Sequence, residues 1–140
     1  MSGTPVQRAA RVVGVVFLVV GIAGFVPGLT TDLYGGLEFA GDEGTSELLG
    51  VFAVSVLHNL VHGLFGIAGL ALAATPNGAR SYLLGGGGIY LALALLGLVG
   101  AAEWIPADRA DDVLHVALGA GMIGLGIAAT RASTPARFTD

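Results

Sequence analysis

The chain has 140 residues, of which 54% are hydrophobic and 11% are charged, with a mean hydropathy of +0.83 and a formal net charge of −4. Soluble domains carry about 25% charged residues, so this composition predicts a membrane protein. The chain contains neither cysteine nor lysine, which excludes disulfides, thiolate nucleophiles, Schiff-base chemistry and P-loop phosphate binding. Because only six residues are basic, we expect no binding to nucleic acid.

Four long apolar stretches alternate with the segments that hold the charged residues. The stretches cover residues 9–29, 48–74, 82–102 and 113–130. A bilayer core of about 30 Å needs about 20 apolar helical residues to cross it, and each stretch is close to that length or above it. The sequence therefore predicts an all-α protein with a single integral membrane domain, residues 1–140, built as a four-transmembrane-helix bundle.

The first stretch follows Arg8 and Arg11, as the apolar run of a signal peptide follows its basic residues. It ends in Gly-Phe-Val-Pro-Gly at residues 24–28 and lacks the small-x-small site expected for cleavage. We therefore expect this stretch to be retained as the first membrane helix.

The next segment, residues 30–47, is the longest predicted outer loop. It is acidic and glycine-rich and carries several apolar residues, which favours a short interfacial helix or hairpin on the outer surface. A hydroxyl at Thr45 or Ser46, followed by Glu47, favours a helix start, because the hydroxyl caps free amides and the carboxylate faces the positive end of the helix.

The two remaining connections are short. Residues 75–80 are rich in turn formers, and such a short inner turn makes the second and third helices antiparallel neighbours. The second outer loop, residues 103–112, contains Trp104, which is expected to be an interfacial anchor. Asp111 and Asp112 favour the start of the fourth helix.

The arginines are distributed unevenly between the two sides of the predicted bundle. With the N-terminus in the cytoplasm, the inside segments hold Arg8, Arg11, Arg80, Arg131 and Arg137, and the outer loops hold Arg109. This asymmetry follows the positive-inside rule. It predicts that both termini lie inside.

Small residues are frequent within the apolar stretches. The chain has 24 glycines, and small residues let membrane helices approach closely. The run of four glycines at residues 85–88 indicates such an approach, although a kink or a surface for a lipid or cofactor is also open. Residues 56–58 and 113–115 are both Val-Leu-His and precede similar glycine-rich runs, which favours a parallel repeat of two helical hairpins.

All three histidines lie in or near the predicted helices. His58 and His62 are four residues apart and share one helix face, with Asn59 on a nearby face, and His115 lies at a similar depth at the start of the fourth stretch. Polar groups at this depth need partners. The candidate cofactor-binding residues are therefore His58, Asn59, His62 and His115.

Several interpretations of these residues remain open. They can tie helices together by hydrogen bonds, as we also expect of Tyr90 and Ser55. Alternatively, they can line a site for zinc or copper, for a bis-histidine haem, or for a quinone or a proton. The pattern identifies no catalytic residue and leaves metal ligands and cofactors undefined.

The histidines also carry a family resemblance. The elements Asn59-Leu-x-His62-Gly and Asp112-x-Leu-His115, within a pattern that covers nearly the whole chain, resemble a prokaryotic family of small four-helix integral membrane proteins that is catalogued as a domain of unknown function. The chain is more loosely similar to the DoxX-like four-helix proteins, some of which are linked to quinone redox chemistry. The first resemblance implies a fold and a location in the cytoplasmic membrane, and it implies no activity.

The expected function is accordingly that of a structural or accessory membrane protein and not of an enzyme. Its partners would be the lipid bilayer and either further copies of itself or a larger membrane complex. The alternative is a redox or ligand-binding protein with a histidine-lined site in the outer half of the bundle. A transporter is a third interpretation, but the chain is short and has no inverted repeat.

Overall fold

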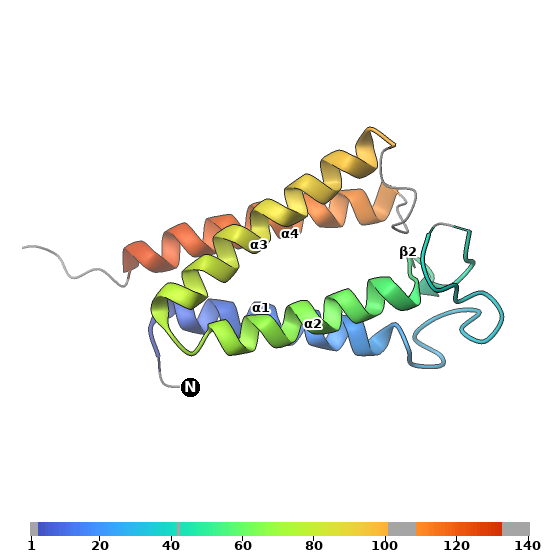
Figure 1. Cartoon of the computed structure of the whole chain (residues 1–140), viewed down its shortest axis with the longest axis horizontal. Coiled ribbons are helices and arrows are strands. Elements are labelled where there is room, and N and C mark those ends of the chain that lie inside the picture. The colour runs from blue at the N-terminus through green and yellow to red at the C-terminus, as the bar shows by residue number, and fades with distance from the viewer. Residues whose placement is uncertain (1–2, 42, 101–108, 133–140) are drawn as a thin grey trace, which may run out of the picture.

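The computed structural model describes residues 3–41, 43–100 and 109–132. Its helices are α1 (Pro5–Ala23), α2 (Val56–Leu72), α3 (Pro76–Leu98) and α4 (Arg109–Ala132), and its strands are β1 (Glu47–Leu48) and β2 (Phe52–Ala53) (Figure 1). The two strands pair as an antiparallel hairpin directly before α2. This part of the chain is mostly helical, which confirms the predicted all-α class.

Three of the helices are long and apolar enough to cross a membrane. They are α1, α3 and the Arg109–Ala129 part of α4. Helix α2 is equally apolar but has 17 residues, which span about 25 Å at 1.5 Å per residue. This length is shorter than a typical bilayer core of about 30 Å. The predicted span over residues 48–74 is too long, because the helix in this region covers only Val56–Leu72.

The error lies at the start of α2. Ser55 is its N-cap, with a side-chain oxygen that accepts a hydrogen bond from the His58 amide at 3.1 Å. Upstream, Leu49 and Gly50 have positive φ angles of 57° and 67°, which no right-handed helix contains. The expected helix start at Thr45 or Ser46 is therefore wrong. An apolar run alone does not distinguish a buried helix from a hairpin.

The other helix ends also differ from the predicted boundaries. Helix α1 begins at Pro5 and ends at Ala23, several residues before the predicted 29. The inner turn is shorter than predicted, because Thr75 caps α3 and Pro76 is its first residue, the position at which proline is favoured. Helix α4 begins before residue 113, and Asp111 and Asp112 lie in its first turn as expected. Trp104 lies outside the described residues.

The helices pack as two antiparallel pairs. The closest packing joins α1 to α2 and α3 to α4, and the pairs lie side by side (Figure 1). The side chain of Gln7 joins the start of α1 to the end of α2, since its amide donates to the carbonyls of Ala73 and Ala74 at 3.0 and 2.9 Å. This pairing is the one that two consecutive helical hairpins produce, while the sequence duplication itself stays a prediction.

Glycines make the contacts within each pair close. A Cβ at Gly66 would lie 2.5 Å from the Leu18 amide nitrogen, and one at Gly87 would lie 2.7 Å from the Gly119 carbonyl oxygen. The close helix approach predicted for residues 85–88 is thus confirmed at Gly87, whereas Gly86 faces the ends of the Phe65 and Met122 side chains. Gly85 and Gly88 face away, with nothing within 4 Å of an added Cβ.

The two ends of the helix arrangement carry different charges. The end with the start of α1, the α2–α3 turn and the end of α4 holds Arg8, Arg11, Arg80 and Arg131. The opposite end holds Arg109 and the acidic residues of the described ranges, Asp32, Glu38, Glu43, Glu47, Asp111 and Asp112. The basic and acidic side chains are therefore separated along the helix axes.

Candidate functional site

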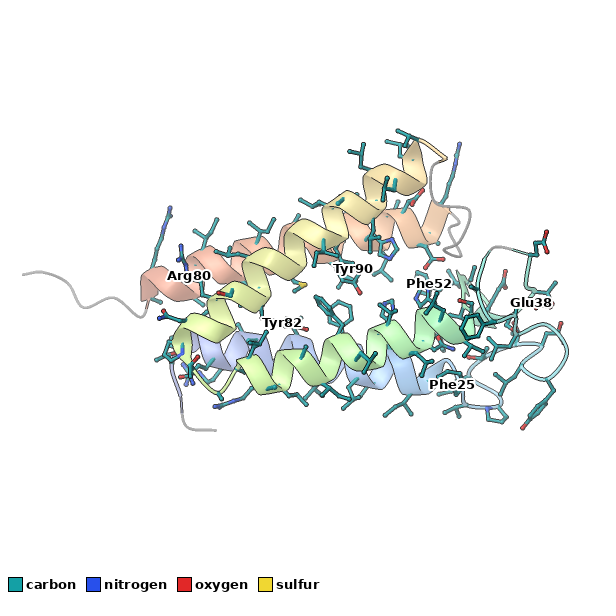
Figure 2. The ribbon with its side chains drawn as sticks, in the orientation of Figure 1. Phe25, Glu38, Phe52, Arg80, Tyr82 and Tyr90 are labelled. Atoms are coloured by element: carbon teal, nitrogen blue, oxygen red, sulfur yellow. The ribbon has the colours of Figure 1, made fainter. Side chains whose placement is uncertain are left out.

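The structure brings the three predicted histidines together around Tyr90. The rings of His58 and His62, one turn apart on α2, stack with centroids 4.2 Å apart and an interplanar angle of 4°. The Tyr90 ring of α3 lies 6.2 Å from that of His62 and 5.3 Å from that of His115 on α4. The cluster therefore connects the α1–α2 pair to the α3–α4 pair, and Figure 2 shows Tyr90 facing the space between them.

His62 is held by hydrogen bonds at both ring nitrogens. Its Nδ1 lies 3.0 Å from the His58 carbonyl oxygen, and its Nε2 lies 3.4 Å from the Tyr90 hydroxyl. Because a carbonyl only accepts, the neutral imidazole carries its proton on Nδ1 and accepts a long hydrogen bond from Tyr90 at Nε2. Tyr90 is thus an inter-helix hydrogen-bond partner, as predicted, and Ser55 caps α2 instead.

Aromatic side chains surround the hydrogen-bonded pair. Phe17 of α1 is 2% exposed, and its ring centroid lies 5.5 Å from that of His62, 5.0 Å from that of Phe65 and 5.1 Å from that of Tyr90. Neither Phe17 nor Phe65 was predicted from the sequence. His58, His62 and Phe65 lie at i, i+4 and i+7, the spacing that defines one helix face, so Phe65 could have been identified from the sequence.

Asn59 does not join the histidines. It is 2% exposed and packs against the chain just after α1, where a Cβ added at Gly24 would overlap its side-chain amide. It follows His58 by one residue, which turns it about 100° around a helix of 3.6 residues per turn. Its Nδ2 has no hydrogen-bond partner in the described ranges. Asn59 is therefore a contact between α2 and the end of α1.

The geometry does not assemble a metal centre from the residues that are described. Among them, no three histidine, aspartate or glutamate side chains are grouped so that they would hold a metal ion. The stacked rings of His58 and His62 are almost parallel, so their nitrogen lone pairs do not converge on one point. Both nitrogens of His62 are also engaged. The arrangement is that of a packed, hydrogen-bonded link between helices.

Two open apolar grooves flank the first half of α4, away from the histidines. One, of about 570 Å³, is lined by Leu91, Ala94, Leu95, Leu98, Asp112, Val113, Val116 and Ala117. The other, of about 510 Å³, is lined by Phe52, Arg109, Ala110, Val113, Leu114 and Ala117. No histidine lines either groove, so the histidine cluster is separate from these two grooves.

The chain is mostly helical and has long apolar helices, so it belongs to the class of α-helical proteins that are compatible with a membrane. Within that class, the chain belongs to a family described as a domain of unknown function, DUF4383, whose model matches residues 7–128. No curated protein and no solved structure is significantly similar to it. The expected membership of a family of unknown function is confirmed, and the looser resemblance to the DoxX-like proteins is not.

Proposed function

We propose that this chain is a multi-pass protein of the cytoplasmic membrane of a prokaryote and that all four helices cross the bilayer, with both termini inside. The separation of charge along the helix axes supports this orientation, because arginines gather on the cytoplasmic side of membrane proteins. Helix α2 has 17 residues, the lower end of the range that spans a membrane. One face of α2 packs against α1, and the opposite face exposes leucines, as expected for a helix that crosses a membrane.

We further propose that its role is that of a structural or accessory subunit, joined to a second copy or to a larger complex. The observation that carries this role is a pair of exposed stripes of small residues on α3 and α4. The stripes consist of Ser81, Gly85, Gly88 and Ala92 on α3 and of Ala117, Gly121, Gly124 and Ala128 on α4. Both repeat at i, i+4, i+7 and i+11, the spacing of one helix face.

These stripes are suited to contacts with other membrane helices. A Cβ added at any of their four glycines would have nothing within 4 Å, so the chain's own described residues do not use the space beside them. Lipid provides no hydrophobic drive between helices, and membrane interfaces therefore rely on small residues that let backbones approach. A glycine face turned away from the chain's own helices supports a contact with another chain.

Enlarging a stripe residue tests this role. We expect Gly88→Leu and Gly124→Leu to leave the helix content intact, because the new side chain points into open space, and to abolish the dimeric or complex mass seen by native mass spectrometry after mild extraction. Leu64→Phe, which enlarges an exposed residue on α2 and so lies off both stripes, is the matched control and should keep that mass. An unchanged assembly in both glycine variants, or a wild-type chain that is always alone, would contradict the proposal.

The convergence of His58, His62 and His115 at Tyr90 favours a second candidate function, a redox or ligand-binding site. This candidate predicts that native mass spectrometry of the wild-type chain detects the added mass of a haem or a quinone. Replacement of all three histidines by glutamine should remove that mass while retaining hydrogen-bonding groups. A wild-type mass equal to the chain or to its multiples would leave the histidines as links between helices.

A further inference from the structure

The β1–β2 hairpin ends in an apolar tip that no other described part of the chain covers. Leu49 is 65% exposed and Val51 is 49% exposed. Leu49 also has a φ of 57°, a left-handed conformation that is unfavourable for a residue with a branched side chain. The tip therefore presents two exposed apolar side chains, and such exposure is favourable where the surrounding is itself apolar.

Several backbone amides of this hairpin are hydrogen-bonded within the protein. Besides the pairing of β1 with β2, the Leu49 amide donates to the Leu29 carbonyl at 2.7 Å, and the Val54 amide donates to the Ser46 carbonyl at 3.0 Å. Thr31 adds a further bond to the Glu47 carbonyl at 2.9 Å. Internal bonds lower the cost of placing non-helical backbone near a bilayer, and these amides of the hairpin are bonded in this way.

The hairpin is fixed at the level where the helices end. It directly precedes α2, whose first two amides, at Val56 and Leu57, donate to the carbonyls of Glu38 and Phe39 at 3.0 and 2.9 Å. These bonds join the loop to the start of α2 and satisfy amides that have no partner within the helix. Figure 2 shows Phe52 of the hairpin and Phe25 after α1 at this same end of the molecule.

The tip also continues the apolar surface of α1. Ile22 is 57% exposed at the end of α1, and Phe25 and Leu29 are exposed in the chain that follows it. Leu29 is in turn bonded to Leu49 through its carbonyl. An exposed apolar strip therefore leads from the helix to the hairpin tip, and residues 48–53 between Glu47 and Val54 carry no charge.

We propose that the β1–β2 hairpin is an interfacial anchor, with Leu49 and Val51 seated in the boundary between lipid headgroups and acyl chains. The partner is the bilayer itself, and the inference rests on the membrane crossing proposed above. Apolar side chains beside a crossing helix gain free energy by entering this boundary. The acidic side chains of the loop, such as Glu43, stay on the aqueous side.

The absence of cysteine from the sequence allows a direct test. Single cysteines at Leu49, Val51, Glu43 and Leu64 are labelled with a nitroxide in the full chain, reconstituted in vesicles of phosphatidylcholine and phosphatidylglycerol. Oxygen concentrates among acyl chains and a neutral nickel chelate stays in water. We expect the ratio of oxygen to nickel accessibility to be highest at Leu64 on the exposed face of α2, lower at Leu49 and Val51, and lowest at Glu43.

The possible outcomes separate the two proposals. A tip ratio as low as that of Glu43, with a high ratio at Leu64, overturns the anchor and leaves the membrane crossing intact. Low accessibility of Leu49 and Val51 to both reagents also overturns it, because another protein surface then covers the tip. A low ratio at Leu64 overturns the crossing itself. The two tip positions are read independently, so one variant that fails to fold does not end the test.

Discussion

Replacing Gly66 by alanine is expected to lower the free energy of unfolding by about 1–3 kcal/mol, the usual cost of forcing an extra methyl into a packed interface. The added Cβ would lie 2.5 Å from the Leu18 amide nitrogen and 2.7 Å from the Gly14 carbonyl oxygen. Both are backbone atoms, so relief requires α1 and α2 to move apart. Gly66→Val should separate the helices further and reduce the yield of folded protein. Denaturant titration in detergent micelles, followed by circular dichroism, measures the effect.

Gly63 supplies the matched control, because it lies on the same helix only one turn away. An added Cβ there has no atom of the described residues within 4 Å. Alanine also has the higher helix propensity, so Gly63→Ala is expected to leave the midpoint unchanged or raise it slightly. Equal midpoints for the two variants would mean that the close contact between α1 and α2 does not limit stability.

This comparison also separates what the sequence could and could not predict. Composition and the length of the apolar stretches predicted helices correctly, because long apolar runs without charges have few other structures available. Glycine content indicated close packing, but not which glycines are in contact. Gly63 and Gly66 look alike in the sequence, and only the rotation of α2 against α1 distinguishes them.

The boundary of α2 could not be predicted for a related reason. Residues 48–53 are as apolar as the helix that follows, and the features that end the helix are the left-handed backbone at Leu49 and the cap at Ser55. The positive φ of a leucine is set by the bonds of the hairpin and not by its own preference. Local propensity therefore pointed to the wrong start.

The candidate site was predicted in part. The i, i+4 spacing correctly placed His58 and His62 on one face, and the depth of His115 correctly brought it near them. Asn59 was grouped with them on proximity in sequence, whereas the helix rotation turns it toward Gly24. Apolar residues occupy several faces of α1, so no periodicity in the sequence distinguished Phe17 from its neighbours that face outward.

Phe17→Ala is expected to destabilise the protein by roughly 2–3 kcal/mol. The side chain is fully buried between both helix pairs, with ring contacts to His62, Phe65 and Tyr90. In a membrane the unfolded side chain would still contact lipid, so little of the transfer free energy is lost. The main contribution to the destabilisation is therefore the cavity. About 100 Å³ of lost side-chain volume, at about 24 cal/mol per Å³, gives this magnitude.

The same substitution at Phe39, which is 66% exposed, removes an equal volume without opening a cavity, and its free energy of unfolding should change by less than about 0.5 kcal/mol. Phe17→Leu should lower the free energy of unfolding by about half as much as Phe17→Ala, because leucine fills part of the space. The loss of the ring also frees His62 and Tyr90 to reorient, so amide hydrogen exchange should increase on both α2 and α3. Faster exchange confined to α1 would instead mean that Phe17 fixes its own helix and does not join the two pairs.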